Sequence, residues 1–183
     1  PILAFTTRFN GHSNILYNQI TILPPEDFPS IKFEPVKITA IWDTGATHTC
    51  ITEKLAKQLG LIPTTKRETQ TAGGSEISDV YIVDIGLPNR YKIKSVQVGA
   101  VKIHDGIDAL IGMDIIGAGD FSVSNVDGIT IFSFRMPSLK EVDYVEIGKR
   151  SLQKISSNET KKSKKKRRKQ AKNSRKQNRK KRK

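Results

Sequence analysis

An acidic residue directly after a buried strand is the feature that most constrains this chain. The apolar run 36–42 leads into the sequence D-T-G-A-T at 43–47, and the apolar pair Cys50-Ile51 follows shortly afterwards. Burying a carboxylate costs on the order of several kcal/mol unless it is hydrogen-bonded or neutralised. A sequence that places Asp43 on a tight glycine turn at the end of such a strand therefore either satisfies the acid structurally or uses its altered ionisation in chemistry.

Charge divides the 183 residues into a domain and an appendage. Residues 161–183 contain 16 of the 32 Lys and Arg residues and none of the 18 acids, so the formal charge of +14 belongs to this segment. Composition and turn residues indicate an N-terminal extension at 1–13, one folded domain at 14–135, a linker at 136–160 and a tail at 161–183. A domain of this length buries enough surface for its own core.

Hydrophobic periodicity favours strands over helices within the domain. Alternating or continuous apolar runs predict seven or so strands, at 14–22, 36–42, 77–85, 91–101, 109–111, 121–123 and 129–134. Asp127-Gly128 predicts a hairpin turn. A short helix is expected over 52–59, with Thr52 as its N-cap and Gly60 as its stop, and a helical turn at 114–116. The pattern is that of an all-β sandwich or barrel with one or two short helices.

Cysteine content and hydropathy indicate the compartment. One cysteine excludes an intramolecular disulfide framework and suits a reducing compartment. The start of the chain lacks the basic and apolar regions of a signal peptide, and no apolar run approaches the roughly 18 residues of a membrane span. We expect a cytoplasmic protein without a membrane partner.

The turn after the buried strand resembles the active-site loop of retropepsin-like aspartic proteases, with Asp43, Thr44, Gly45 and Ala46 in the D-T-G-A order of that family. The resemblance implies a closed β barrel in which Asp43 is catalytic, Thr44 holds two loops together and Gly45 lets the backbone turn. It also implies a polypeptide substrate and no cofactor or metal. Proteolysis of this type needs two carboxylates that share a proton. Because the chain holds no second D-T-G copy, a homodimer with one Asp43 from each protomer is expected.

Two later segments follow in the order of the same family, so that the resemblance covers about residues 14–135. Ala72, Gly73, Gly74 and Ser75 are similar to the flap hairpin that closes over substrate, and glycines permit the turn and the motion of such a lid. The segment Leu110, Ile111 and Gly112 is similar to the strand that supports the active-site loop.

The chain departs from the retroviral pattern at a pair of positions and at the residue before the acid. Thr47 and Met113 stand where retroviral enzymes carry an Asp and an Arg that pair with each other. Trp42 is bulkier than the Leu or Val usual before the catalytic Asp. The loop and the helix ending in Leu-Gly-Leu resemble the cellular and bacterial cytoplasmic members instead.

Other chemistries find weaker support in the sequence. His48 and Cys50 are two residues apart in the sequence. On a strand they would face the same side, so a Cys–His nucleophile pair is an alternative. His12, His48 and His104 have no partners at metal-ligand spacing. Gly117-Ala118-Gly119 begins like a dinucleotide loop but lacks the third glycine. If the dimer hypothesis were wrong, Asp114 or Asp108 would be the nearest candidates for a second carboxylate.

The tail is expected to be disordered and to bind polyanions. Its core, Lys164, Lys165, Lys166, Arg167, Arg168 and Lys169, lies in a segment with no aromatic and almost no apolar side chain. Such a run releases counterions from nucleic acid whatever the base sequence, so RNA, DNA or ribosomes are the expected partners. In a nucleated cell it would serve as a nuclear signal. A solubilising extension is the simpler alternative. A second hypothesis is a nucleic-acid-binding module whose protease-like domain is inactive or only dimerises.

Overall fold

The computed structural model describes residues 3–71, 74–103, 106–153, 162, 164–165 and 168–170. The chain divides into two compact units, Pro1–Leu139 and Lys140–Lys183. The first unit is built almost entirely from strands, with two short helices. The expected all-β fold class is confirmed.

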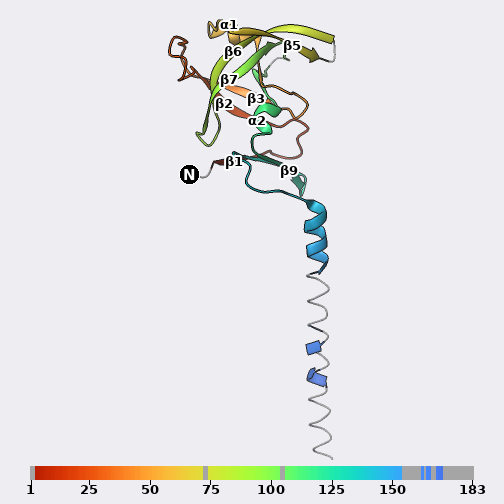
Figure 1. The fold of residues 1–183 in the computed structure, drawn as a ribbon. Coiled ribbons are helices and arrows are strands. Elements are labelled where there is room, and N and C mark those ends of the chain that lie inside the picture. The colour runs from red at the N-terminus through yellow and green to blue at the C-terminus, as the bar shows by residue number, and fades with distance from the viewer. Residues whose placement is uncertain are drawn as a thin grey trace, which may run out of the picture. The chain divides into compact units, whose positions relative to one another are not determined.

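The described residues of the first unit form ten strands and two helices, several of which are labelled in Figure 1. In chain order they are β1 (Ala4–Arg8), β2 (Tyr17–Leu23), β3 (Val36–Trp42), β4 (Cys50–Thr52), α1 (Glu53–Gln58), β5 (Thr65–Thr71), β6 (Gly74–Gly86), β7 (Lys92–Val101), β8 (Ala109–Ile111), α2 (Met113–Ile116), β9 (Asp120–Val126) and β10 (Ile129–Arg135).

Six of the strands close into a barrel. They follow the order β2-β3-β8-β4-β7-β6, and β6 pairs back onto β2 through Ile22↔Ile85 and its neighbours. Strand β8 lies between β3 and β4, parallel to β3 and antiparallel to β4. The chain segment that joins β3 to β4 must therefore cross the end of β8. This segment is 43–49, which contains the D-T-G-A sequence.

Alternation along the strands fills the barrel with aliphatic side chains. The inward positions of β2, β3, β6 and β8 are almost fully buried, and they include Ile22, Ile38, Val83, Ile85 and Ile111. The side chains between them on β2 and β3 are more exposed. Period-two patterning thus sets which face of each strand meets the core.

A second, three-stranded sheet of order β1-β10-β9 packs against the barrel through aromatic rings. Trp42 at the end of β3 is 4% exposed and lies 4.9 Å, centroid to centroid, from Phe134 and 5.5 Å from Phe5. It also stacks on Phe121 at 6.0 Å. The small sheet therefore accommodates the bulky residue that precedes Asp43.

Strand β1 lies inside the segment 1–13, which the sequence assigned to an extension outside the domain. It pairs with β10 from Ala4↔Arg135 to Arg8↔Ile131, so the folded part begins well before residue 14. The physical reason is Phe5, whose ring also contacts Phe132 edge-on at 5.8 Å. A five-residue strand with one large apolar side chain shows little periodicity, and only its tertiary partners explain it.

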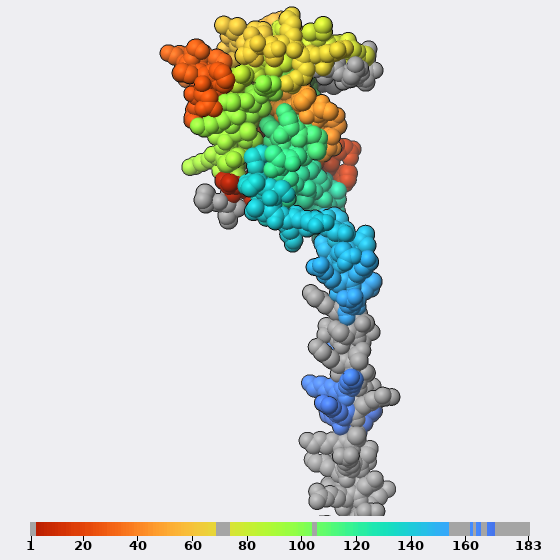
Figure 2. Space-filling model, in the orientation of Figure 1, coloured from red at the N-terminus to blue at the C-terminus, as the bar shows by residue number. Residues whose placement is uncertain are grey.

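The long hairpin of β5 and β6 extends beyond the barrel. Thr65 pairs with Val80 and Thr71 with Gly74, and the β6 residues from Gly74 to Ile77 are exposed. In Figure 2 this hairpin, in yellow and yellow-green, lies at the opposite end of the unit from the small sheet. Gly74 has φ +121°, a conformation that favours glycine.

The second unit contains helical residues where a linker was expected. Residues 144–153 are helical, and Asp143 Oδ1 accepts the backbone N–H groups of Val145 and Glu146 at 2.8 and 3.1 Å. In the tail, residues 162, 164–165 and 168–170 are helical and exposed, whereas Lys166 and Arg167 lie outside the described residues. Disorder of the tail stays a prediction. None of the helices described is long and apolar enough to cross a membrane.

Candidate active site

The loop at 43–49 is anchored to the end of β8 by backbone hydrogen bonds. The N–H of Asp43 donates to the carbonyl of Ile111 at 2.9 Å, and the N–H of Met113 donates to the carbonyl of Ala46 at 2.8 Å. Because β8 is held between β3 and β4, these bonds fix both ends of the turn. The predicted supporting segment, Leu110 to Gly112, lies directly beside the predicted active-site loop.

The carboxylate of Asp43 is held by its own turn. The N–H of Gly45 donates to Asp43 Oδ1 at 2.8 Å, and a β carbon on Gly45 would lie 3.2 Å from that oxygen. Asp43 is half-buried, while Thr44 and Gly45 are exposed. The turn thus presents the acid at the surface of this unit, with two exposed residues beside it.

Gly112 is required by the close approach of the loop to β8. A β carbon at this position would lie 2.5 Å from the carbonyl carbon of His48 and 2.9 Å from the backbone nitrogen of Thr49. Both neighbours are backbone atoms and cannot rotate away. The glycine of the Leu-Ile-Gly segment therefore has a steric role that sequence spacing alone does not show.

A buried hydroxyl links the far end of the loop to α2. Thr49, which is fully buried, donates from its hydroxyl to Asp114 Oδ1 at 2.7 Å and from its N–H to Asp114 Oδ2 at 2.9 Å. The same hydroxyl accepts the N–H of Gly112 at 3.1 Å. Thr49 was not among the site residues predicted from the sequence. Its only signal was a polar residue directly before the apolar pair Cys50-Ile51, and its partners are more than sixty positions away.

The two alternative second carboxylates are both committed elsewhere. Asp114 binds Thr49 and the N–H of Ile115. Asp108 Oδ2 accepts the N–H of Thr39 at 3.3 Å. Thr39 lies four residues before Asp43 along β3. At about 3.3 Å per residue this separates Asp108 from Asp43 by about 13 Å. Both acids therefore accept donors of their own chain, and among the described residues neither is hydrogen-bonded to Asp43.

The predicted flap lies on the β5–β6 hairpin. Gly74 and Ser75 begin β6, and the Ser75 hydroxyl donates to the carboxylate of Glu68 on β5. Ala72 and Gly73, the other two predicted flap residues, lie outside the described residues. A hairpin with glycine at its turn therefore stands where a lid was expected, and its closing role stays a prediction.

The Cys–His alternative does not match the geometry. Cys50 is buried and its Sγ contacts the backbone carbonyl of His48 at 3.4 Å, while the His48 residue itself is exposed. Burial, together with the negative charge of Asp114, raises the pKa of the Cys50 thiol, which is opposite to what a nucleophile needs. Among the described residues no group of His, Cys, Asp and Glu could hold a metal ion.

Residues 30–115 match the family model described as "Aspartyl protease", a range that contains Asp43, Thr49, Gly112 and Asp114. The resemblance to retropepsin-like aspartic proteases is confirmed. Among curated proteins, no match is found.

Three solved structures similar to this chain are retropepsin-like or retroviral proteases. They are a retropepsin-like aspartic protease from Rickettsia conorii (16% identity, TM-score 0.47, covering 74% of this chain and 96% of that one), the protease of Simian Foamy Virus (mac) (23%, 0.38, 57% and 92%) and the retroviral protease-like domain of Ddi1 from Leishmania major (16%, 0.40, 72% and 99%).

Proposed function

We propose that this protein is an aspartic endopeptidase that acts as a homodimer, with Asp43 of each protomer forming the catalytic pair. The observation that carries the proposal is the presentation of Asp43. Its carboxylate lies at the surface on a turn fixed to Ile111, and among the described residues its one hydrogen-bond partner is the N–H of Gly45. The match of residues 30–115 to the aspartyl protease family supports the same chemistry.

The need for a partner follows from the positions of the other acids. Asp114 and Asp108 satisfy backbone and hydroxyl donors of their own chain. A second copy related by a two-fold axis places an identical Asp43 opposite the first, since an isologous interface brings the same residue from both sides. The exposed Thr44 and Gly45 are then the residues that meet across the axis.

In this arrangement one carboxylate of the pair removes a proton from water while the protonated one donates a hydrogen bond to the peptide carbonyl. The water oxygen bonds to the carbonyl carbon, and a tetrahedral diol forms. The C–N bond then breaks as a proton passes to the amide nitrogen, which leaves a carboxylic acid and an amine. Since two carboxylates in contact share one proton, activity is higher on the acid side of neutrality.

The polybasic tail adds a polyanion-binding function to the proposal. Half of the Lys and Arg residues of the chain lie in 161–183 without an acid among them. RNA, DNA or ribosomes are the proposed partners, held by charge and not by base sequence. The alternative function, a nucleic-acid-binding module with an inactive or only dimerising protease-like domain, rests on this same composition.

Cleavage of a peptide library by the wild type and by Asp43→Asn tests the proposal. The Asn side chain keeps an oxygen that can accept the Gly45 N–H, so the fold is expected to persist while proteolysis falls by at least about a hundredfold. Adding excess Asp43→Asn to the wild type should also lower activity per wild-type chain in proportion to the wild-type fraction. Undiminished cleavage by Asp43→Asn would contradict the catalytic role, and an active monomer in sedimentation would contradict the shared site.

A further inference from the structure

A row of four directly paired residues crosses the outer face of the barrel. Lys37 on β3 pairs with Thr21 on β2, Thr21 pairs with Gly86 on β6, and Gly86 pairs with Lys92 on β7. Directly opposed residues of neighbouring strands present their side chains on the same face. The row therefore has two long basic side chains at its ends and two small residues in its middle.

This arrangement produces a hollow of ≈ 580 Å³ above the row. The side chains of β2 pack closely over Gly86 at the base of the hollow. A β carbon on Gly86 would lie 3.2 Å from Leu23 Cδ1 and 3.4 Å from Thr21 Cβ. The volume is within the range of small-molecule sites, roughly 300–1,000 Å³. Its lining combines three cations with an apolar end: Lys37, Arg90, Lys92, Leu23, Leu87 and Pro88.

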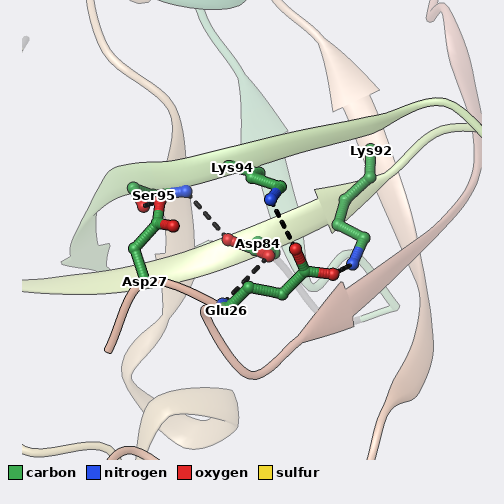
Figure 3. A network of polar contacts seen from close by, with 6 residues as sticks. All are labelled: Glu26, Asp27, Asp84, Lys92, Lys94 and Ser95. Carbon is green, nitrogen blue, oxygen red and sulfur yellow. Dashed lines mark hydrogen bonds and ion pairs between the residues drawn. The ribbon is translucent and has the colours of Figure 1, made fainter. Parts of the chain in front are cut away.

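The hollow has an excess of positive charge. None of its lining residues is acidic. Glu26, which is not part of the lining, contacts Lys92 and also Lys94, as Figure 3 shows, so one carboxylate is shared between two lysines. Lys37 and Arg90 form no ion pair within the described part of the chain. At least two positive charges therefore remain without a counter-charge.

The hollow lies far from the proposed catalytic acid. Lys37 is six residues before Asp43 along β3, which corresponds to about 20 Å of extended strand. The hollow is also on the outer face of the barrel, because Ile22 and Ile85, which adjoin Thr21 and Gly86 along their strands, are buried in the interior. Ligand binding here can be measured without any assumption about proteolysis.

We propose that this hollow binds a phosphate monoester dianion attached to a compact apolar group. Two uncompensated cations match a dianion better than a monocarboxylate, and guanidinium and ammonium groups are the side chains that bind phosphate oxygens. Leu23 and Pro88 provide a surface for the apolar part of the ligand. The hydroxyl of Thr21 and the glycine floor allow the phosphate to approach the sheet closely.

The experiment is a titration of the full-length protein with phenyl phosphate, inorganic phosphate and benzoate, followed through the backbone amide NMR signals of Thr21 and Gly86. A local readout is needed because the basic tail also attracts anions. We expect saturable shifts with phenyl phosphate, weaker binding of inorganic phosphate and the weakest binding of benzoate. Benzoate that binds as tightly as phenyl phosphate, or no saturable shift at these amides, would overturn the proposal.

Matched variants separate the hollow from the tail. Lys37→Gln and Arg90→Gln should each weaken phenyl phosphate binding about tenfold, the size of one charge-assisted hydrogen bond. Lys57→Gln, on the exposed side of α1 and outside the hollow, should leave the affinity unchanged. Because Arg90 sits in a turn with φ +63°, Lys37→Gln provides the test should the Arg90 variant fold poorly. Equal affinities of Lys37→Gln and Lys57→Gln would assign the binding to the tail and refute the site.

Discussion

Asp114 binds Thr49 through both of its carboxylate oxygens, and this pair holds the end of the loop that begins at Asp43. The two residues are 65 positions apart in the sequence. Thr49 in turn accepts the N–H of Gly112, so a single buried hydroxyl connects the loop, the end of β8 and the start of α2. The position of the candidate catalytic acid thus depends on a contact between Thr49 and Asp114, two residues outside the D-T-G sequence.

Asp114→Asn should lower both stability and turnover. An amide offers one oxygen where two donors of Thr49 need acceptors, so one buried donor loses its partner at a cost of about 1.5 kcal/mol. Thermal unfolding and peptide cleavage measure the two effects, with Glu53→Gln on the exposed first turn of α1 as the control. An Asp114→Asn protein with the stability and turnover of the wild type would show that the pair does not position the loop.

Gly112→Ala should unfold the domain or destabilise it severely. The new β carbon would meet the backbone of His48 at 2.5 Å, which requires the loop to move away from β8, and overpacking of this kind costs about 3 kcal/mol or more. Gly99→Ala is the matched control, because its β carbon would lie 3.6 Å from the nearest atoms. Denaturant unfolding of the two variants should differ by most of that amount. Equal free energies of unfolding for Gly112→Ala and Gly99→Ala would mean that the loop can move away from β8 without destabilising the domain.

Much of the barrel could be predicted from the sequence because its strands are strongly apolar. The bounds of β3 and β8 agree with the predicted segments 36–42 and 109–111, and Thr52 caps α1 by accepting the N–H of Leu55 at 3.1 Å. Strand β5 was missed, since the sequence TKRETQT contains no apolar residue and is ordered by backbone pairing with β6. Strand β4 was missed because it spans three residues directly before a helix.

The site was predicted from short local motifs, so the prediction missed roles that depend on contacts between distant segments. The turn at Asp43 is formed by bonds between neighbours, such as Gly45 N–H to Asp43, and short motifs capture those. The steric role of Gly112 and the hydrogen bonds of Thr49 arise only when β8 is inserted between β3 and β4. Sequence periodicity predicts that strands exist, but it does not order them in a sheet.

Glu26→Gln should reduce the acid sensitivity of the fold. Hydrogen bonds and charge from Lys92 and then Lys94 lower the pKa of Glu26 from 4.5 to about 2. A carboxyl whose pKa is lower in the folded than in the unfolded state stabilises the fold fully above pH 4.5 and loses that contribution as the pH falls toward about 2. The melting temperature of the wild type should therefore fall more steeply across this window than that of Glu26→Gln. Glu76→Gln, at an exposed position of β6, should retain the wild-type slope, and parallel curves for all three proteins would contradict the assignment.

Gly74→Val tests the proposed lid. Gly74 has φ +121°, and a β-branched residue is strained in that conformation and also restricts motion of the hairpin. Apart from Gly74 itself and its chain neighbours, no atom of the described residues lies within 4 Å of the position its β carbon would take, so the core is not disturbed. Turnover should fall much more than the melting temperature. If turnover and melting temperature fell to a similar relative extent, the hairpin would have a structural role and the lid would have to be another segment.

Deletion of residues 161–183 tests the role of the tail. The deletion removes 16 positive charges and almost no apolar surface, so the fold and the cleavage of a short peptide should change little while nucleic-acid affinity collapses. For the intact protein, the logarithm of affinity should fall with the logarithm of salt concentration by about 0.9 per phosphate neutralised on duplex DNA and about 0.7 on single strands, with little dependence on base sequence. A variant with Gln at Lys164, Lys165, Lys166, Arg167, Arg168 and Lys169 keeps the length of the tail and should show a shallower salt slope. If the deleted protein still bound several unrelated RNAs and DNAs, the nucleic-acid surface would have to lie on residues 1–160, and the alternative of a nucleic-acid-binding module with an inactive or only dimerising protease-like domain would be favoured over the protease.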